Sequence, residues 1–284
     1  MNVQWYPGHM TKALRQMQED IKLIDLVVEI VDARVPISSR NPEIDSLAKG
    51  KGRLILLNKC DLSDKRVNDA WVKYYKENNV TAVLIDSRNG KGLKEIQGAV
   101  QESCKEKIER DRKRGIMNRP LRAMICGIPN VGKSTFINSF AKKACTKTGN
   151  KPGVTKGKQW IRLNKTLELL DTPGVLWPKF EDQQVGINLA MIGSINDEIL
   201  STDELACEIF KFLKANYPGT IEKRYDISED ADNLGILEAI GRKRGCLIKG
   251  GEVDLNKAAN IVIDEFRAGK IGLFSIERPL EKPL

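Results

Sequence analysis

The chain has 284 residues, which is long enough for two domains with sizeable cores. Hydrophobic residues make up 41% of it and charged residues 30%, a balance that excludes a disordered or membrane-embedded protein and favours a soluble one. A net charge of +9 makes polyanions plausible partners, with a merely solubilising surface as the alternative. Because no signal-like core or membrane-spanning apolar run is found, we expect a cytoplasmic protein without a membrane partner.

The positive charge is concentrated in the first two-thirds of the chain. Residues 180–284 carry 13 Lys and Arg against 19 Asp and Glu, a net −6, so residues 1–179 carry 34 against 19, a net +15. A bound polyanion should therefore contact mainly the first part. The six cysteines include no C-x-x-C pair and there is one histidine, so we interpret the cysteines as reduced thiols rather than metal ligands.

Strands and helices alternate over the first 170 residues. A helical pattern with apolar positions from Leu14 to Ile24 precedes predicted strands at residues 26–31, 53–57 and 80–85. Two further strands are predicted at residues 121–126 and 167–170. This alternation predicts an α/β fold with a mostly parallel sheet flanked by helices, which binds ligands at the carboxyl ends of its strands.

The remainder of the chain has helical patterns only. Ser201 and Glu204 have the spacing of a capping box at a helix start. A short helix is predicted at residues 233–239, and Asp254 is a plausible N-cap for a helix that Gly269 ends. We therefore expect an α/β domain at residues 1–178 and a small all-helical domain at residues 179–284.

The sequence GIPNVGKS at residues 127–134 fits the phosphate-binding pattern G-x-x-x-x-G-K-[ST]. It follows a predicted strand and opens a predicted helix, which favours a nucleotide site over a structural glycine-rich turn. In such a loop, backbone N–H groups point at phosphate oxygens, the lysine adds a positive charge, and the serine hydroxyl ligates Mg²⁺. The expected nucleotide contacts are Asn130, Val131, Gly132, Lys133, Ser134 and Thr135.

The sequence DTPG at residues 171–174 follows the last predicted strand. The carboxylate of Asp171 would hold Mg²⁺ through a water molecule, and the Gly174 N–H would contact the γ-phosphate. Four residues alone are a weak signal, but together with the phosphate loop they indicate a nucleoside triphosphate site.

The sequence NKCD, beginning at Asn58, would recognise the base. The Asp61 carboxylate can accept the N1–H and 2-amino hydrogens of guanine, which adenine does not offer. Asn58 can donate to the acceptor edge of the ring, and the Lys59 stem can pack on its face. In the next strand-end loop, Ser87 could present its N–H to the guanine carbonyl, with Asp86 beside it. The alternative is an ordinary strand-end turn.

The base-recognition loops precede the phosphate loop, the reverse of the usual order in GTPases. In this order the chain resembles the circularly permuted GTPases, and its start, WYPGHM at residues 5–10, and its length resemble the bacterial ribosome biogenesis GTPases among them. The resemblance implies a cytosolic enzyme that hydrolyses GTP to GDP and phosphate, acts in late assembly of the large (50S) ribosomal subunit and contacts ribosomal RNA. We also expect contacts with ribosomal proteins, and a monomer away from the ribosome.

Residues 142–165 contain eight Lys and Arg and no acid, which favours nucleic-acid contact over mere solubilisation. A protein-partner switch whose basic loops only solubilise it is the rival interpretation.

The residue that activates water is not evident, because Val175 and Leu176 follow Gly174 where GTPases commonly place a glutamine. Either hydrolysis is intrinsically slow, as in a GTP sensor, or the missing group comes from elsewhere. His9 is the only histidine, and its neutral imidazole could accept a proton from the attacking water or could instead hold the N-terminal turn.

The expected catalytic residues are His9, Lys133 and Thr155, and two cations are expected beside them. Thr155 is the expected switch threonine that joins Ser134 and Asp171 around Mg²⁺, with Thr148 as its competitor. Asn130 is expected to help hold K⁺, because related potassium-activated GTPases use an asparagine at that position. The expected cofactors are thus Mg²⁺ and K⁺.

Overall fold

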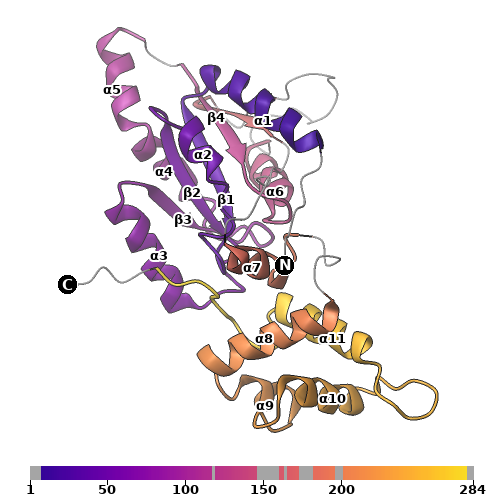
Figure 1. Cartoon of the computed structure of the whole chain (residues 1–284). Helices are drawn as coiled ribbons and strands as arrows, with labels where there is room; N and C mark the ends of the chain where they lie inside the picture. The colour runs from indigo at the N-terminus through magenta and orange to yellow at the C-terminus, as the bar shows by residue number, and fades with distance from the viewer. Residues whose placement is uncertain are drawn as a thin grey trace. The chain divides into compact units, whose positions relative to one another are not determined.

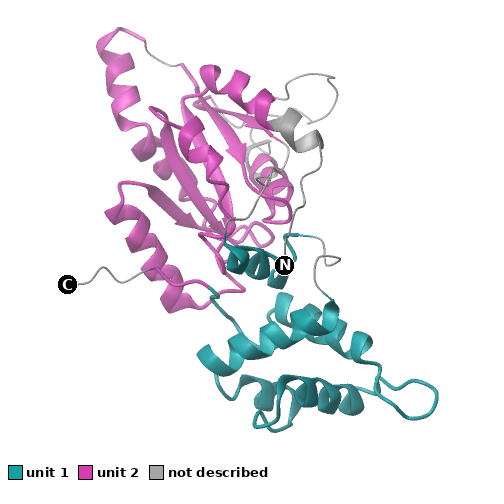
Figure 2. Cartoon of the chain, viewed as in Figure 1, with its two compact units in different colours: residues 1–3, 180–276 teal, residues 4–179, 277–284 magenta. Residues whose placement is uncertain are grey.

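The computed structural model describes residues 8–116, 119–145, 160–162, 165–172, 182–195 and 201–279. The chain divides into two compact units (Figure 2). We call residues 4–179 with 277–284 the sheet unit, and residues 1–3 with 180–276 the helical unit. The sequence predicted one C-terminal domain for residues 179–284, whereas the last described residues, 277–279, group with the sheet unit.

The core of the sheet unit is a six-stranded sheet with the order β3-β2-β1-β4-β6-β5. Five strands are parallel, and only β5, at the edge, is antiparallel to its neighbour. The strands are β1 (Leu26–Asp32), β2 (Gly52–Asn58), β3 (Thr81–Leu84), β4 (Leu121–Cys126), β5 (Trp160–Arg162) and β6 (Leu167–Asp171). All seven residues of the central strand β1 are buried, as expected for a parallel strand covered on both faces. The predicted α/β fold with a mostly parallel sheet is confirmed.

Helices flank this sheet (Figure 1). They are α1 (Gly8–Asp20), α2 (Glu43–Leu47), α3 (Lys65–Glu77), α4 (Ile96–Ser103), α5 (Lys105–Lys113) and α6 (Lys133–Cys145), with a short 3-10 helix at Ile21–Leu23. In α3, Trp71 and Tyr75 lie one turn apart on one face and pack against Ile55 and Leu57 of β2. The Asp64 carboxylate caps this helix by accepting the Arg66 N–H.

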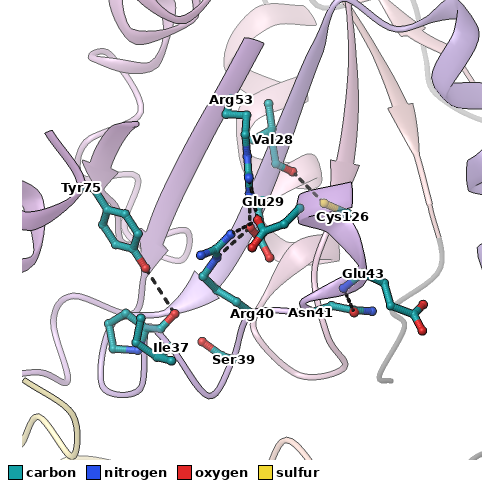
Figure 3. A network of polar contacts seen from close by, with 12 residues as sticks. Val28, Glu29, Ile37, Ser39, Arg40, Asn41, Glu43, Arg53, Tyr75 and Cys126 are labelled. Atoms are coloured by element: carbon teal, nitrogen blue, oxygen red, sulfur yellow. Dashed lines mark hydrogen bonds and ion pairs between the residues drawn. The ribbon is translucent and has the colours of Figure 1, made fainter. Parts of the chain in front are cut away.

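A charged network secures the long connection between β1 and β2 (Figure 3). Glu29, in the middle of β1, accepts hydrogen bonds from Arg40 Nε at 3.1 Å and Arg53 Nη2 at 3.4 Å through the same oxygen, Oε2. The Tyr75 hydroxyl donates to the Pro36 carbonyl at 3.4 Å. These contacts hold residues 36–40 beside the sheet.

Glu277 fastens the same connection from the far end of the chain. Its carboxylate accepts the backbone N–H groups of Ile37 and Ser38, at 2.6 and 3.0 Å, and the Ser38 hydroxyl. Its own N–H donates to the Arg34 carbonyl, and its carbonyl accepts from Trp71 Nε1, both at 3.2 Å. These hydrogen bonds explain why the last described residues belong to the sheet unit.

The helical unit contains α7 (Gln183–Met191), α8 (Thr202–Asn216), α9 (Thr220–Tyr225), α10 (Asn233–Lys243) and α11 (Leu255–Arg267). The predicted capping box of α8 is present, with Ser201 and Glu204 satisfying each other's backbone N–H groups. The Asp254 carboxylate caps α11 as predicted, accepting the Lys257 N–H at 3.0 Å. Within the described ranges, no helix is long and apolar enough to span a membrane.

Candidate functional site

The loops that follow β2, β3 and β4 surround one cavity of about 570 Å³, a volume typical of small-molecule sites. It opens where the rule for parallel sheets places ligands, at the carboxyl ends of the strands. Its lining combines both loops expected to recognise the base with the phosphate loop: Asn58, Lys59, Asp61, Leu62, Asp86, Ser87, Arg88, Ile128, Pro129, Asn130, Gly132, Lys133, Ser134 and Thr135. The structure thus joins motifs that lie about seventy residues apart in the sequence.

The phosphate loop turns sharply between the end of β4 and the start of α6 at Lys133. Gly132 has a φ of 95°, and a Cβ there would lie 2.3 Å from Asn58 Nδ2. At Gly127, a Cβ would lie 2.7 Å from the Ile30 carbonyl oxygen. Glycine is therefore required at both positions for packing, and at Gly132 for backbone conformation as well. Asn130 also has a left-handed φ, of 62°, although it is not a glycine.

Asn58, at the end of β2, forms hydrogen bonds with the loops after β3 and β4. Its side chain is buried; Nδ2 donates to the Val131 carbonyl at 2.7 Å, and Oδ1 accepts from Ser87 N at 3.1 Å and Ser87 Oγ at 2.8 Å. Ser87 lines the cavity, and its N–H donates to Asn58 in this structure, so its expected contact with the guanine carbonyl stays a prediction. The sequence identified Asn58 as a base contact but did not indicate these hydrogen bonds.

Asp86 also serves its own loop. Its Oδ1 accepts the backbone N–H groups of Arg88 and Asn89 at 2.9 and 3.1 Å, and its Oδ2 accepts from Asn89 Nδ2 at 2.6 Å. Both carboxylate oxygens therefore have partners within the turn, and the residue is buried. In this structure Asp86 stabilises the loop and also lines the cavity, so its expected contact with the nucleotide stays a prediction. Asp61, in contrast, is exposed in the cavity.

Lys59 crosses from the base loop to the phosphate loop. Its backbone has a left-handed φ of 60°, and Nζ donates to the Asn130 carbonyl at 2.8 Å. The same Nζ lies 3.0 Å from Asp32 Oδ2, at the end of β1. Asp32 was not among the residues predicted for the site.

The pKa of Asp32 lies well below its ordinary value. Complete burial acts to raise it, but the positive charges of Arg34 and Lys59 and their hydrogen bonds outweigh that effect. The pKa of Arg34 is raised: burial acts to lower it, and the charges of Asp32 and Asp61 outweigh burial. The pair is therefore fully ionised at neutral pH.

The phosphate loop and the end of β6 meet at Lys133 and Asp171. Lys133 Nζ lies 2.6 Å from Asp171 Oδ1, and the Thr172 hydroxyl donates to the Ile125 carbonyl at 2.6 Å. The Asp171 carboxylate and the Ser134 hydroxyl are hard oxygen donors that suit Mg²⁺. These two donors, of which Ser134 lines the cavity, therefore fit the expected cation.

Several predicted site residues lie outside the described part of the chain. Thr148, Thr155 and Gly174 are among them. The backbone of His9 lies in α1, but its side chain is outside the description. Their assigned roles stay predictions.

A parallel sheet that carries NKCD after β2 and a phosphate loop after β4 defines a circularly permuted P-loop GTPase. A family model described as "50S ribosome-binding GTPase" matches residues 122–226. The chain is 50% identical over 283 residues to ribosome biogenesis GTPase A of Priestia megaterium, covering 99% of this chain and 98% of that protein. It is 31% identical over 275 residues to the Thermotoga maritima protein of the same name, covering 97% and 94%.

Solved structures agree with this assignment. The GNP-bound YlqF structure from T. maritima superposes with a TM-score of 0.70 at 28% identity, covering 95% of this chain and all of that one. A GDP-bound YlqF structure gives 0.69 at 27% identity, covering 93% and 99%. The chain belongs to the ribosome biogenesis GTPase A family.

Proposed function

We propose that this protein binds GTP, hydrolyses it to GDP and phosphate, and acts in late maturation of the large (50S) ribosomal subunit. One observation carries the proposal: a single cavity is lined by the guanine-type NKCD loop and by the phosphate loop. The family names support both the chemistry and the setting, since the relatives are called ribosome biogenesis GTPase A.

The base end and the phosphate end of the cavity have different chemistry. At the base end, Asp61 is exposed and acts as the acceptor for the guanine N1–H and 2-amino group, while the Lys59 stem packs on the ring. Asn58 holds the surrounding loops and retains a second hydrogen on Nδ2 for the base. At the phosphate end, Lys133 and the backbone N–H groups of residues 130–135 bind the β- and γ-phosphates.

Mg²⁺ would be held by Ser134 and, through a water, by Asp171, with Thr155 completing the set. When bound, Mg²⁺ neutralises charge on the β- and γ-phosphates. Lys133 would contact phosphate oxygens through the same ammonium group that contacts Asp171 in this structure, since a lysine ammonium has three donors. Gly174 contacts the γ-phosphate through its N–H.

Hydrolysis transfers the γ-phosphate to water. We assign His9 as the group that accepts a proton from the attacking water, and Asn130 as a K⁺ ligand whose cation stabilises charge between the phosphates. The support is the absence of a glutamine after Gly174 in the sequence and the place of Asn130 on the cavity lining.

The ribosomal partner is proposed to be ribosomal RNA, with ribosomal proteins at its edge. The support is electrostatic: residues 1–179 carry a net +15, and the end of α5 exposes Arg110, Arg112, Lys113 and Arg114. Accordingly, we assign the protein to the cytoplasm, as a monomer when it is not bound to the ribosome.

The test is GTP turnover with and without purified large ribosomal subunits, in K⁺ and again in Na⁺. We expect strong stimulation by the subunit, a requirement for K⁺, and loss of turnover in Lys133→Ala. Lys73→Ala is the matched control, because Lys73 is exposed on α3 and lies outside the cavity lining.

Two results would change the proposal. GTP binding without stimulated turnover would favour a GTP sensor, which the sequence after Gly174 leaves open. Binding to the subunit that hardly weakens between 50 and 200 mM salt would favour a protein partner over RNA, because phosphate contacts should cost about 10³-fold or more over that range.

A further inference from the structure

Asp32 and Arg34 form a buried ion pair beside the nucleotide cavity, and no role in the site has been given to either residue so far. The Asp32 side chain is fully buried at the end of β1, and Arg34 is 3% exposed. Oδ1 of Asp32 accepts from Arg34 Nε at 2.9 Å and from Arg34 N at 3.1 Å, while Oδ2 accepts from Arg34 Nη2 at 2.8 Å. This two-point geometry fixes the direction of the carboxylate.

Besides its hydrogen bond from Arg34, Asp32 Oδ2 has a second contact, with the ammonium group of Lys59. Lys59 Nζ lies 3.0 Å from it and also donates to the Asn130 carbonyl at 2.8 Å. The ammonium group is thus held between the end of β1 and the phosphate loop. Left-handed backbone conformations at both Lys59 and Asn130 bring the two loops close enough for this contact.

A lysine has a long flexible stem, and ordering it at the moment of binding would cost conformational entropy. A lysine already held in place avoids that cost when the ligand arrives. Arg34 matters because its charge and hydrogen bonds, together with those of Lys59, keep the buried Asp32 carboxylate ionised. The Arg34 carbonyl accepts the Glu277 N–H.

We propose that Asp32 and Arg34 are positioning residues that hold Lys59 across the cavity and thereby set the affinity for guanine nucleotides. This inference rests on the proposed binding of GTP and GDP. The pair touches no ligand itself and acts only through Lys59, so its effect on binding should depend on the presence of that lysine.

A double-mutant cycle tests this dependence. Asp32→Asn combined with Arg34→Gln replaces the ion pair by two neutral polar side chains. This double change is made once with Lys59 intact and once with Lys59→Met. Binding of GDP is measured by titration calorimetry, and the stoichiometry reports the folded fraction. With Lys59 intact, we expect the neutral pair to raise the dissociation constant about 10-fold; with Lys59→Met, by less than about 2-fold. Equal effects in both backgrounds, or no effect in either, would overturn the proposal.

The matched control is Glu29→Gln with Arg40→Gln. It neutralises a second ion pair, between Glu29 on the same strand, which is buried, and Arg40, which is partly exposed. Among the described contacts this pair has none with Lys59. We expect its dissociation constant for GDP to stay within about 2-fold of the native value. A loss as large as that of the Asp32–Arg34 variant would mean that the effect is general destabilisation. If the native protein fails to bind GDP, the proposed function fails; if it binds and the cycle is additive, only the positioning role fails.

A measurement on the native chain covers the case in which the neutral pair does not fold. Reductive methylation followed by peptide mass spectrometry compares Lys59 with Lys65, which is exposed at the start of α3. Held by a buried carboxylate, Lys59 should be methylated at least several-fold more slowly than Lys65. Equal rates would show that the contact is not maintained in solution and would overturn the proposal.

Discussion

Two buried carboxylates on strand β1 have opposite pKa shifts. Asp32 and Glu29 are three residues apart, are 0% and 2% exposed, and each faces two cationic side chains. Nevertheless the pKa of Asp32 is lowered and that of Glu29 is raised. For both, burial is the largest influence and acts to raise the pKa; only at Asp32 do the neighbouring charges outweigh it.

The difference lies in how each carboxylate is hydrogen-bonded. Both oxygens of Asp32 have donors at 2.8 to 3.1 Å. Glu29 uses only Oε2, while its buried Oε1 has no hydrogen-bond partner among the described residues. Arg40 and Arg53 also share Asp45, each at 2.5 Å. A buried carboxylate is therefore well stabilised in its charged form where both oxygens accept hydrogen bonds. It is poorly stabilised where one oxygen has no donor and its arginines also contact another carboxylate. The Asp32 pair lies beside the candidate site, and the Glu29 pair lies away from it.

The largest expected effect is that of Asp32→Asn. It leaves Arg34 buried and without its charged partner, which typically costs about 3–5 kcal/mol of stability. Urea unfolding followed by tryptophan fluorescence measures it, since all four tryptophans precede residue 180 and report on the sheet unit. A loss below about 1 kcal/mol would mean that this pair is no stronger than the one at Glu29.

Glu277→Ala should have the next largest effect. As at Asp32, both carboxylate oxygens of Glu277 accept hydrogen bonds. Their donors are the N–H groups of Ile37 and Ser38 and the Ser38 hydroxyl. Removing it takes this acceptor from the exposed Ile37 N–H and the partly buried Ser38 donors, at a cost of about 1–3 kcal/mol in the same unfolding assay. The control is Glu252→Ala, an exposed glutamate of the helical unit, which should leave the stability of the sheet unit unchanged.

Glu29→Gln should cost less than either change, within about 1 kcal/mol of the native protein. The raised pKa means that folding disfavours the charged form, so a neutral side chain of the same shape is tolerated. Arg40 and Arg53 keep Asp45 as a partner. If this variant loses as much stability as Asp32→Asn, the contrast drawn from hydrogen-bond geometry is incorrect.

The sequence predicted the features that depend on residues close together in the chain, and missed most of those that depend on residues far apart. The five parallel strands were predictable because continuous apolar runs are a local signal, and the caps at Ser201 and Asp254 involve residues three apart. Strand β5 was missed, since three residues in a basic stretch carry no alternating pattern.

The site was predicted in its motifs but not in its internal contacts. Asn58 and Val131 are 73 positions apart, and Glu277 lies 240 positions from Ile37, so no local pattern connects them. Asp32 looked like an ordinary strand end, because its role depends on Lys59 in the next strand-end loop. Polar side chains directly after a buried strand were the one signal that could have directed attention to it.

The smallest expected effect is a difference in pH dependence. Glu29 has a folded pKa above 4.5, so its contribution to stability is fully present below that pH and is lost as the pH rises through the folded value. Asp32 has a folded pKa below 3.8, so its contribution is present above 3.8 and is lost as the pH falls through the folded value. Between pH 4.5 and 7.5, the stability of native protein relative to Glu29→Gln should therefore decline, whereas its advantage over Asp32→Asn should stay constant. Urea midpoints of the three proteins across this range measure both trends, and parallel trends would mean that the two carboxylates titrate alike.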